Sequence, residues 1–124
     1  MHVLDNAVQA VKSGGLLLDL QVIRVNPRVE ADGRWLCEID GEPLFRTADA
    51  ATAAIDALVV GGGLLEQVID DHDVRQHYDD GVDLIEAHAD KRRQLPGVAL
   101  PALRALARPC VVREHCRLRR LQVR

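Results

Sequence analysis

Large aromatic side chains are nearly absent from this sequence. Trp35, Phe45 and Tyr78 make up 2% of its 124 residues. A core with so few rings has to be filled by aliphatic side chains, and few platforms remain for stacking nucleobases or a flat cofactor.

Long apolar runs and a secretory leader are also lacking. Hydrophobic residues make up 48% of the chain, which excludes disorder, but no run approaches the roughly 20 apolar residues that cross a bilayer. The first residues, Met1 to Asp5, have neither the basic flank nor the apolar stretch of a signal peptide. We therefore expect one soluble domain over residues 1–124, located in the cytoplasm, with no membrane partner.

Cysteine is scarce and unpaired in the sequence. Cys37, Cys110 and Cys116 form no CxxC motif, so we expect reduced thiols rather than a disulfide framework. Cys116 follows His115, but neighbours on a strand point to opposite faces, and this spacing therefore predicts no Cys-His nucleophile. No catalytic residue is predicted.

The hydrophobic pattern predicts an α/β domain of the mixed α+β kind, with a central sheet and packing helices. One helical stripe consists of Leu4, Ala7, Val8 and Val11. Thr47 is a plausible N-cap for a second helix whose inner side carries Ala51, Ala54, Ile55 and Leu58. Packing helices are expected over about residues 3–13, 48–60, 81–93 and 101–108.

The remaining segments read as strands. Leu16 to Ile23 is almost continuously apolar, which predicts a central strand covered on both faces. Asp32-Gly33 predicts the turn of an antiparallel hairpin over about residues 28–39, whereas Pro43 argues that residues 42–46 form an edge or a loop. Between residues 64 and 78 helical and two-residue periods compete, and we favour extended structure.

A long C-terminal antiparallel strand is expected over about residues 110–123, with one face packed against the core and the other exposed to solvent. The expected packed positions are Cys110, Val112, Cys116 and Leu118. The positions expected on the solvent-exposed face are Arg113, His115, Arg117 and Arg119.

Charge is unevenly distributed. Residues 66–90 contain nine acidic side chains and one basic side chain, whereas residues 108–124 contain six arginines and one acid. The arginine-rich last strand could bind an acidic partner or nucleic acid, but the acidic stretch and the net charge of -3 oppose nucleic-acid binding. Mutual screening of the two segments within one fold is the simpler expectation.

Two further patterns could suggest ligand chemistry. The glycines at 14–15 and 61–63 invite a phosphate-loop interpretation, but each cluster closes a helix instead of opening one, so helix termination is expected. Asp70, His72, Asp73 and His77 are the weak candidates for a metal site. They lack zinc or calcium spacing, and no metal is predicted.

Two segments carry a family resemblance. The helix end Lys12-Ser13-Gly14-Gly15, followed at once by the strand from Leu16 to Gln21, resembles the turn and fifth strand of class I S-adenosylmethionine-dependent methyltransferases, with Ser13 where proline is usual. Cys110 to Leu118 is similar to the closing antiparallel strand of that family. The resemblance covers most of this chain but only the C-terminal, substrate-side half of the fold.

The resemblance implies a substrate pocket but no cofactor site. The family holds S-adenosylmethionine on a glycine-rich loop and an acidic residue that belong to the N-terminal half, so the cofactor would bind only if that half were supplied. We therefore expect no methyl transfer by the chain alone. Asp19 and Gln21, near the end of the strand, are the substrate-pocket candidates, and a homodimer or another partner is expected to cover the exposed sheet edge.

Overall fold

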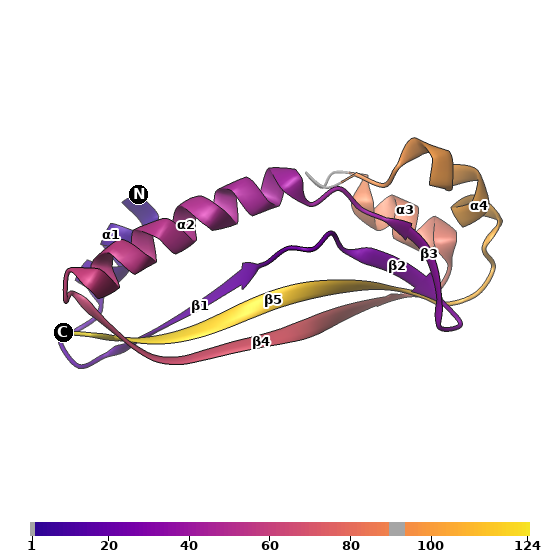
Figure 1. The fold of residues 1–124 in the computed structure, drawn as a ribbon. Helices are drawn as coiled ribbons and strands as arrows, with labels where there is room; N and C mark the ends of the chain where they lie inside the picture. The colour runs from indigo at the N-terminus through magenta and orange to yellow at the C-terminus, as the bar shows by residue number, and fades with distance from the viewer. Residues whose placement is uncertain (1, 90–93) are drawn as a thin grey trace. The chain divides into compact units, whose positions relative to one another are not determined.

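The computed structural model describes residues 2–89 and 94–124, which form helices packed on an antiparallel sheet (Figure 1). In chain order the elements are α1 (His2–Ala10), β1 (Leu16–Val22), β2 (Arg28–Ala31), β3 (Arg34–Glu38), α2 (Glu42–Val60), β4 (Leu64–Tyr78), α3 (Gly81–His88), a 3-10 turn η1 (Gly97–Ala99), α4 (Leu100–Ala105) and β5 (Cys110–Val123). The expected α+β class, with its hairpin and C-terminal antiparallel strand, is confirmed.

β5 pairs directly with β1, β2 and β4. It pairs antiparallel with β1, from Leu16 opposite Gln122 to Val22 opposite Cys116, and antiparallel with β2 around Val29 and Val112. β4 also pairs with β5, and β3 pairs with β2. The long strand expected at the C-terminus and the extended structure expected over residues 64–78 are both confirmed.

Contacts between residues divide the chain into two compact units. The first unit comprises Met1–Ile23, Arg46–His72 and Cys116–Arg124, and the second comprises Arg24–Phe45 and Asp73–His115. The elements α2, β4 and β5 contribute residues to both units. The expectation of a single domain over residues 1–124 stays a prediction.

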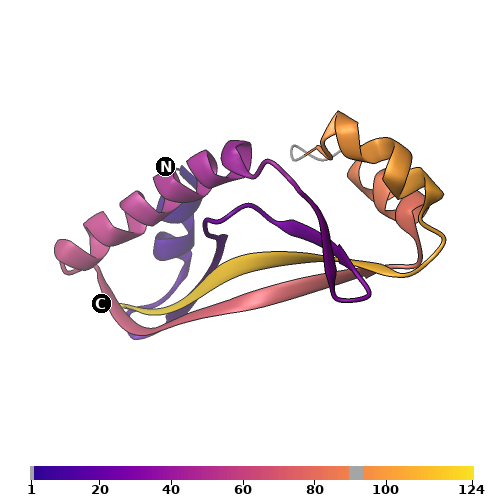
Figure 2. The same cartoon turned by 45° about the vertical axis from the view of Figure 1, so that its right-hand side comes forward.

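Helices α1 and α2 pack on one face of the sheet in the first unit (Figure 1, Figure 2). The buried centre consists of Ile55, Leu64, Leu121 and Val123. Leu4, Val8 and Val11 pack against it, which confirms the apolar stripe of the first helix. That helix ends at Ala10 rather than residue 13, and the Gly14 N–H donates to Val123 O at 2.6 Å.

The expectation that β1 is a central, doubly covered strand is wrong. β1 stands at the end of the strand order and pairs only with β5 among the described residues. Its outward side chains, Leu16, Leu18 and Leu20, are 53%, 70% and 58% exposed. The run looked central because leucines occupy both the helix-facing and the outward positions, although the described helices cover only one face.

The start of α2 was also predicted wrongly. The helix begins at Glu42, so Thr47 lies inside it and residues 42–46 are not a loop. Pro43 is tolerated because a residue in the first helical turn needs no N–H partner. Two hydrogen bonds cap the N-terminal end of α2. The Asp40 side chain accepts the Glu42 N–H at 3.0 Å, and Gly41 O accepts the Phe45 N–H at 2.9 Å.

The second unit is built on the predicted hairpin. Asp32 and Gly33 have φ angles of 52° and 73°, as the tight Asp-Gly turn requires. β2 and β3 pack with α3 and α4 around a buried cluster, whose members are Val29, Ala31, Cys37, Ile39, Leu84, Leu103, Cys110 and Val112.

The two helices of the second unit are shorter than expected. α3 begins where the sequence predicts, and Asp80 Oδ1 caps it by accepting the Asp83 N–H at 2.8 Å, but it ends at His88. Residues 90–93 of the expected helix lie outside the described residues. α4 covers Leu100–Ala105 rather than residues 101–108, since Leu106 is already extended with a ψ of 102°.

Candidate binding site

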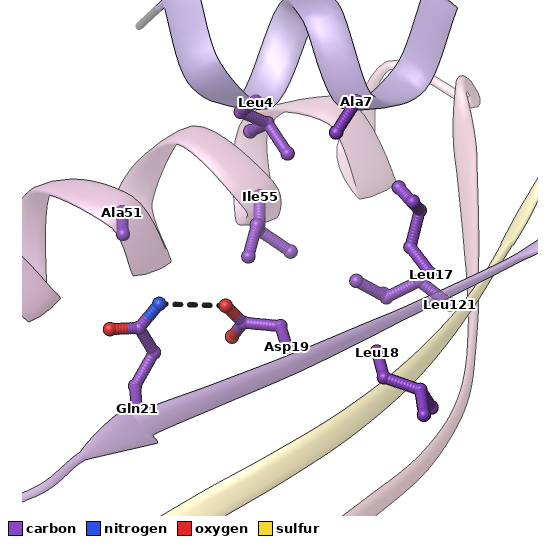
Figure 3. A pocket seen from close by; sticks show the side chains of 9 residues that line it. All are labelled: Leu4, Ala7, Leu17, Leu18, Asp19, Gln21, Ala51, Ile55 and Leu121. Carbon is purple, nitrogen blue, oxygen red and sulfur yellow. Dashed lines mark hydrogen bonds between the residues drawn. The ribbon is translucent and has the colours of Figure 1, made fainter. Parts of the chain in front are cut away.

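A pocket of about 250 Å³ opens in the first unit between β1 and the two helices (Figure 3). Its walls are almost entirely aliphatic, and Asp19 is its one charged residue among those described. The lining residues are Leu4, Ala7, Leu17, Leu18, Asp19, Gln21, Ala51, Ile55 and Leu121.

The two substrate-pocket candidates, Asp19 and Gln21, both line this pocket. They are two residues apart on β1, so both side chains point to the helix-covered face. Figure 3 shows the two side chains facing each other beneath α2, and Gln21 Nε2 donates to Asp19 Oδ1 at 2.7 Å. The amide of Gln21 thereby holds the Asp19 carboxylate in one orientation.

The second oxygen of Asp19 has no such bond. Asp19 Oδ2 is buried and has no hydrogen-bond partner among the described side chains and backbone groups. A carboxylate oxygen removed from water without a donor is costly. The pocket therefore contains one unused acceptor beside apolar walls.

A cation lies near Asp19 in the sheet but binds elsewhere. Arg119 is directly opposite Asp19 in the register of β1 and β5, yet its guanidinium binds Asp56 at 2.8 Å and donates from Nε to Glu66 at 2.8 Å. Burial lowers the pKa of Arg119, but hydrogen bonds to Glu66 and Asp56 outweigh it and raise the pKa above its ordinary value. Arg119 is therefore charged, and its guanidinium is bound to Asp56 and Glu66.

Arg119 also corrects the expected faces of the last strand. It was expected to be wet, but only 5% of it is exposed, and Leu121 and Val123 are buried beside it. In the second unit the buried positions of the same strand are Cys110, Val112 and Glu114. The buried positions change from even to odd numbers along β5, so one strand-wide alternation does not describe it.

Acidic and basic segments pair across β4 and β5, which confirms that they screen each other. Arg117 donates to both carboxylate oxygens of Asp71, at 2.7 and 3.0 Å. These hydrogen bonds are the main reason that the pKa of Asp71 lies below its ordinary value. Binding of nucleic acid or an acidic partner by this strand stays a prediction, which the exposed Arg120 and Arg124 would have to carry.

The four weak metal candidates do not converge. His72 Nδ1 lies 3.1 Å from Asp70 Oδ2, whereas Asp73 Oδ1 lies 2.6 Å from His115 Nδ1. His77 is exposed. Within residues 2–89 and 94–124 no group of three His, Cys, Asp or Glu side chains could hold a metal ion.

The described glycine clusters do not form a cofactor loop. Gly61, Gly62 and Gly63 donate their N–H groups to Ala57 O, Val59 O and Leu58 O, which ends α2 as predicted. These amides are used by the helix and cannot also cradle a ligand.

Cys37, Cys110 and Cys116 are all buried thiols. Burial raises the pKa of the Cys37 and Cys110 thiols above the ordinary value of a thiol. Cys37 also lines a wider hollow of about 510 Å³ in the second unit, whose single charged residue, Arg108, is bound to Asp32 at 2.7 Å. That hollow offers no reactive thiolate and no free charge among its described lining residues.

The helix residues of the pocket were predicted as inward-facing but not as part of a site. Leu4, Ala7, Ala51 and Ile55 belong to the two apolar stripes, which by themselves indicate only packing. The small side chains of Ala7 and Ala51 leave room for the pocket. The sequence shows two alanines, but their effect is recognisable only once the helices lie over β1.

Comparison with known protein families, with characterised proteins and with solved structures finds no match. None of the described helices combines the length and the apolar character needed to span a bilayer.

Proposed function

We propose that the first unit binds a small molecule in the pocket at Asp19 and Gln21, as the substrate-side half of a methyltransferase-like fold, and that the chain alone does not transfer methyl groups. The observation that carries the proposal is the fixed carboxylate beside an apolar pocket. Binding sites of this kind combine apolar walls with a few oriented polar groups. β1 and β5, which contain the two segments of the family resemblance, are also direct antiparallel neighbours.

Binding is tested with three six-carbon probes, n-hexylamine, n-hexanol and n-hexanoate, followed by chemical-shift changes at Ala7, Leu17 and Ile55. At least one probe should bind to the pocket. Ala51→Phe should abolish the shifts because the ring fills the space between α2 and β1. Ala53→Phe is the matched control, since Ala53 is exposed on the same helix and does not line the pocket.

The absence of methyl transfer is tested separately. Calorimetric titration of S-adenosylmethionine into the pure chain should give no stoichiometric binding. A clear stoichiometric signal would contradict that part of the proposal. Failure of all three six-carbon probes would contradict the pocket.

We also propose that a second copy of the chain covers the edge of β1. The N–H and C=O groups on the outer edge of a strand are best satisfied by another extended strand. β1 pairs on one side only within the described chain, and its outward leucines would be repeated around a twofold axis if two copies met antiparallel. The same edge then supplies both halves of the interface.

Sedimentation equilibrium should give twice the chain mass of 13.7 kDa. Leu20→Lys should return the chain mass itself, because a charge would enter the apolar contact; Leu20 is 58% exposed on β1 and does not line the pocket. Leu65→Lys is the control, since Leu65 is an exposed leucine, 38% accessible, on β4. A strictly monomeric wild-type chain would rule out the dimer.

A further inference from the structure

We infer that the ligand of the pocket at Asp19 is a small aliphatic amine, an inference that rests on the proposed function of that pocket. The ammonium group would bind Asp19 Oδ2, and the hydrocarbon would lie against the leucines and alanines of the walls. Three features of the site support this choice.

The first feature is the unused acceptor. Asp19 Oδ1 accepts from Gln21 at 2.7 Å, while the buried Oδ2 has no partner among the described residues. An ionised carboxylate only accepts hydrogen bonds, so the ligand atom that meets Oδ2 has to be a donor. A charged N–H donor forms a stronger bond than a hydroxyl group does.

The second feature is that the cation opposite Asp19 is bound elsewhere. Arg119 lies opposite Asp19 in the register of β1 and β5, but its guanidinium binds the carboxylates of Asp56 and Glu66. Asp19 thus has no ion-pair partner among the described side chains that line the pocket. A carboxylate ligand would be repelled here, and a neutral ligand would leave the charge uncompensated.

The third feature is the size and chemistry of the walls. Seven of the nine lining residues are Leu, Ile or Ala, and a volume of about 250 Å³ exceeds the roughly 150 Å³ of a cavity that holds benzene. An unbranched chain of a few carbons fits that space. The polar end of the pocket and its apolar walls together match an amphipathic cation.

The test compares the affinities of n-hexylamine, n-hexanol and n-hexanoate by calorimetry at neutral pH. The amine should bind about tenfold or more tightly than the alcohol, as a charge-assisted bond predicts. The acid should bind most weakly. Equal affinities for the amine and the alcohol would overturn the inference while leaving the pocket itself supported.

Asp19→Asn isolates the charge. The amide keeps the size of the side chain, so n-hexanol should still bind, and this binding shows that the variant is folded. The preference for the amine should fall to about onefold. Asp70→Asn, which removes one acid of the same unit outside the pocket, should keep the preference, and an amine preference that survives Asp19→Asn would contradict the inference.

Discussion

Arg119 lies directly opposite Asp19 across β1 and β5, yet it forms its ion pairs with Asp56 and Glu66. Cross-strand neighbours of opposite charge usually pair with each other. Here Asp56 of α2 and Glu66 of β4 bind the guanidinium of Arg119. The Asp19 carboxylate instead accepts a hydrogen bond from Gln21, two residues further along the same strand. This division leaves a structural ion pair beside a pocket whose acid is available to a ligand.

Replacement of Arg119 by alanine should destabilise the first unit. Asp56 and Glu66 would lose their shared cation, and the buried aliphatic part of the arginine would leave a gap. Because Asp56 is 57% and Glu66 28% accessible, water offsets part of the loss, and we expect about 2 kcal/mol rather than the larger cost of a fully buried pair. Urea unfolding followed by far-ultraviolet circular dichroism measures the change.

Arg120→Ala is the matched control for this variant. Arg120 is the next residue on β5 and is exposed, so its removal should change the free energy of unfolding by less than about 0.5 kcal/mol. Equal effects of the two substitutions would mean that the ion pairs of Arg119 contribute nothing to stability.

The pair Arg117–Asp71 predicts an acid-range titration. Hydrogen bonds from Arg117 hold the pKa of Asp71 below its ordinary value of 3.8, so the folded state is favoured above that ordinary pKa. The contribution is lost as the pH falls through the lower pKa of the folded chain. In Arg117→Gln the Asp71 carboxyl carbon, followed by NMR, should titrate at a higher pH than in the wild type, and an unchanged midpoint would contradict the pairing.

Gly81 is required by close contact between α3 and α4. A Cβ atom at this position would lie 1.7 Å from the carbonyl oxygen of Leu103, which belongs to backbone and cannot move aside without shifting α4. Gly81→Ala should therefore cost about 3 kcal/mol, at the upper end of overpacking effects. Trp35 is the sole tryptophan and lies in the second unit, so its fluorescence reports unfolding there.

Gly97→Ala provides the comparison for this substitution. No atom lies within 4 Å of the Cβ that would be added at Gly97, and we expect a change within about 0.5 kcal/mol. A neutral Gly81→Ala would show that α3 and α4 are not packed this closely.

The buried thiols should react slowly in the folded protein. Because burial raises the pKa of Cys37 and Cys110 above the ordinary 9.0, little thiolate forms near neutral pH, and the thiolate is the reactive species. Iodoacetamide should modify both cysteines at least about tenfold more slowly in the folded chain than in denaturant. Peptide mass spectrometry reads each site, and fast labelling of the folded chain would contradict their burial.

Local sequence rules predicted much of the fold. Asp32-Gly33 makes the hairpin turn, the glycines at 61–63 end α2, and the long C-terminal strand forms where it was expected. These features depend on neighbours in the chain and can be read from the sequence. The start of α2 was missed because Pro43 has two meanings: it disrupts an inner strand, but it fits the first turn of a helix, and Asp40 closes that turn.

What the sequence by itself determined is the set of elements, the separation of acidic and basic segments, and the choice of Asp19 and Gln21 as residues to inspect. Only the tertiary structure decided that β1 is an edge strand, that Arg119 is buried, and that the two alanines Ala7 and Ala51 leave a pocket over Asp19. Periodicity states which side chains share a face, but not whether another element covers that face or which of several acids a cation binds. Those outcomes depend on contacts between residues that are far apart in the chain.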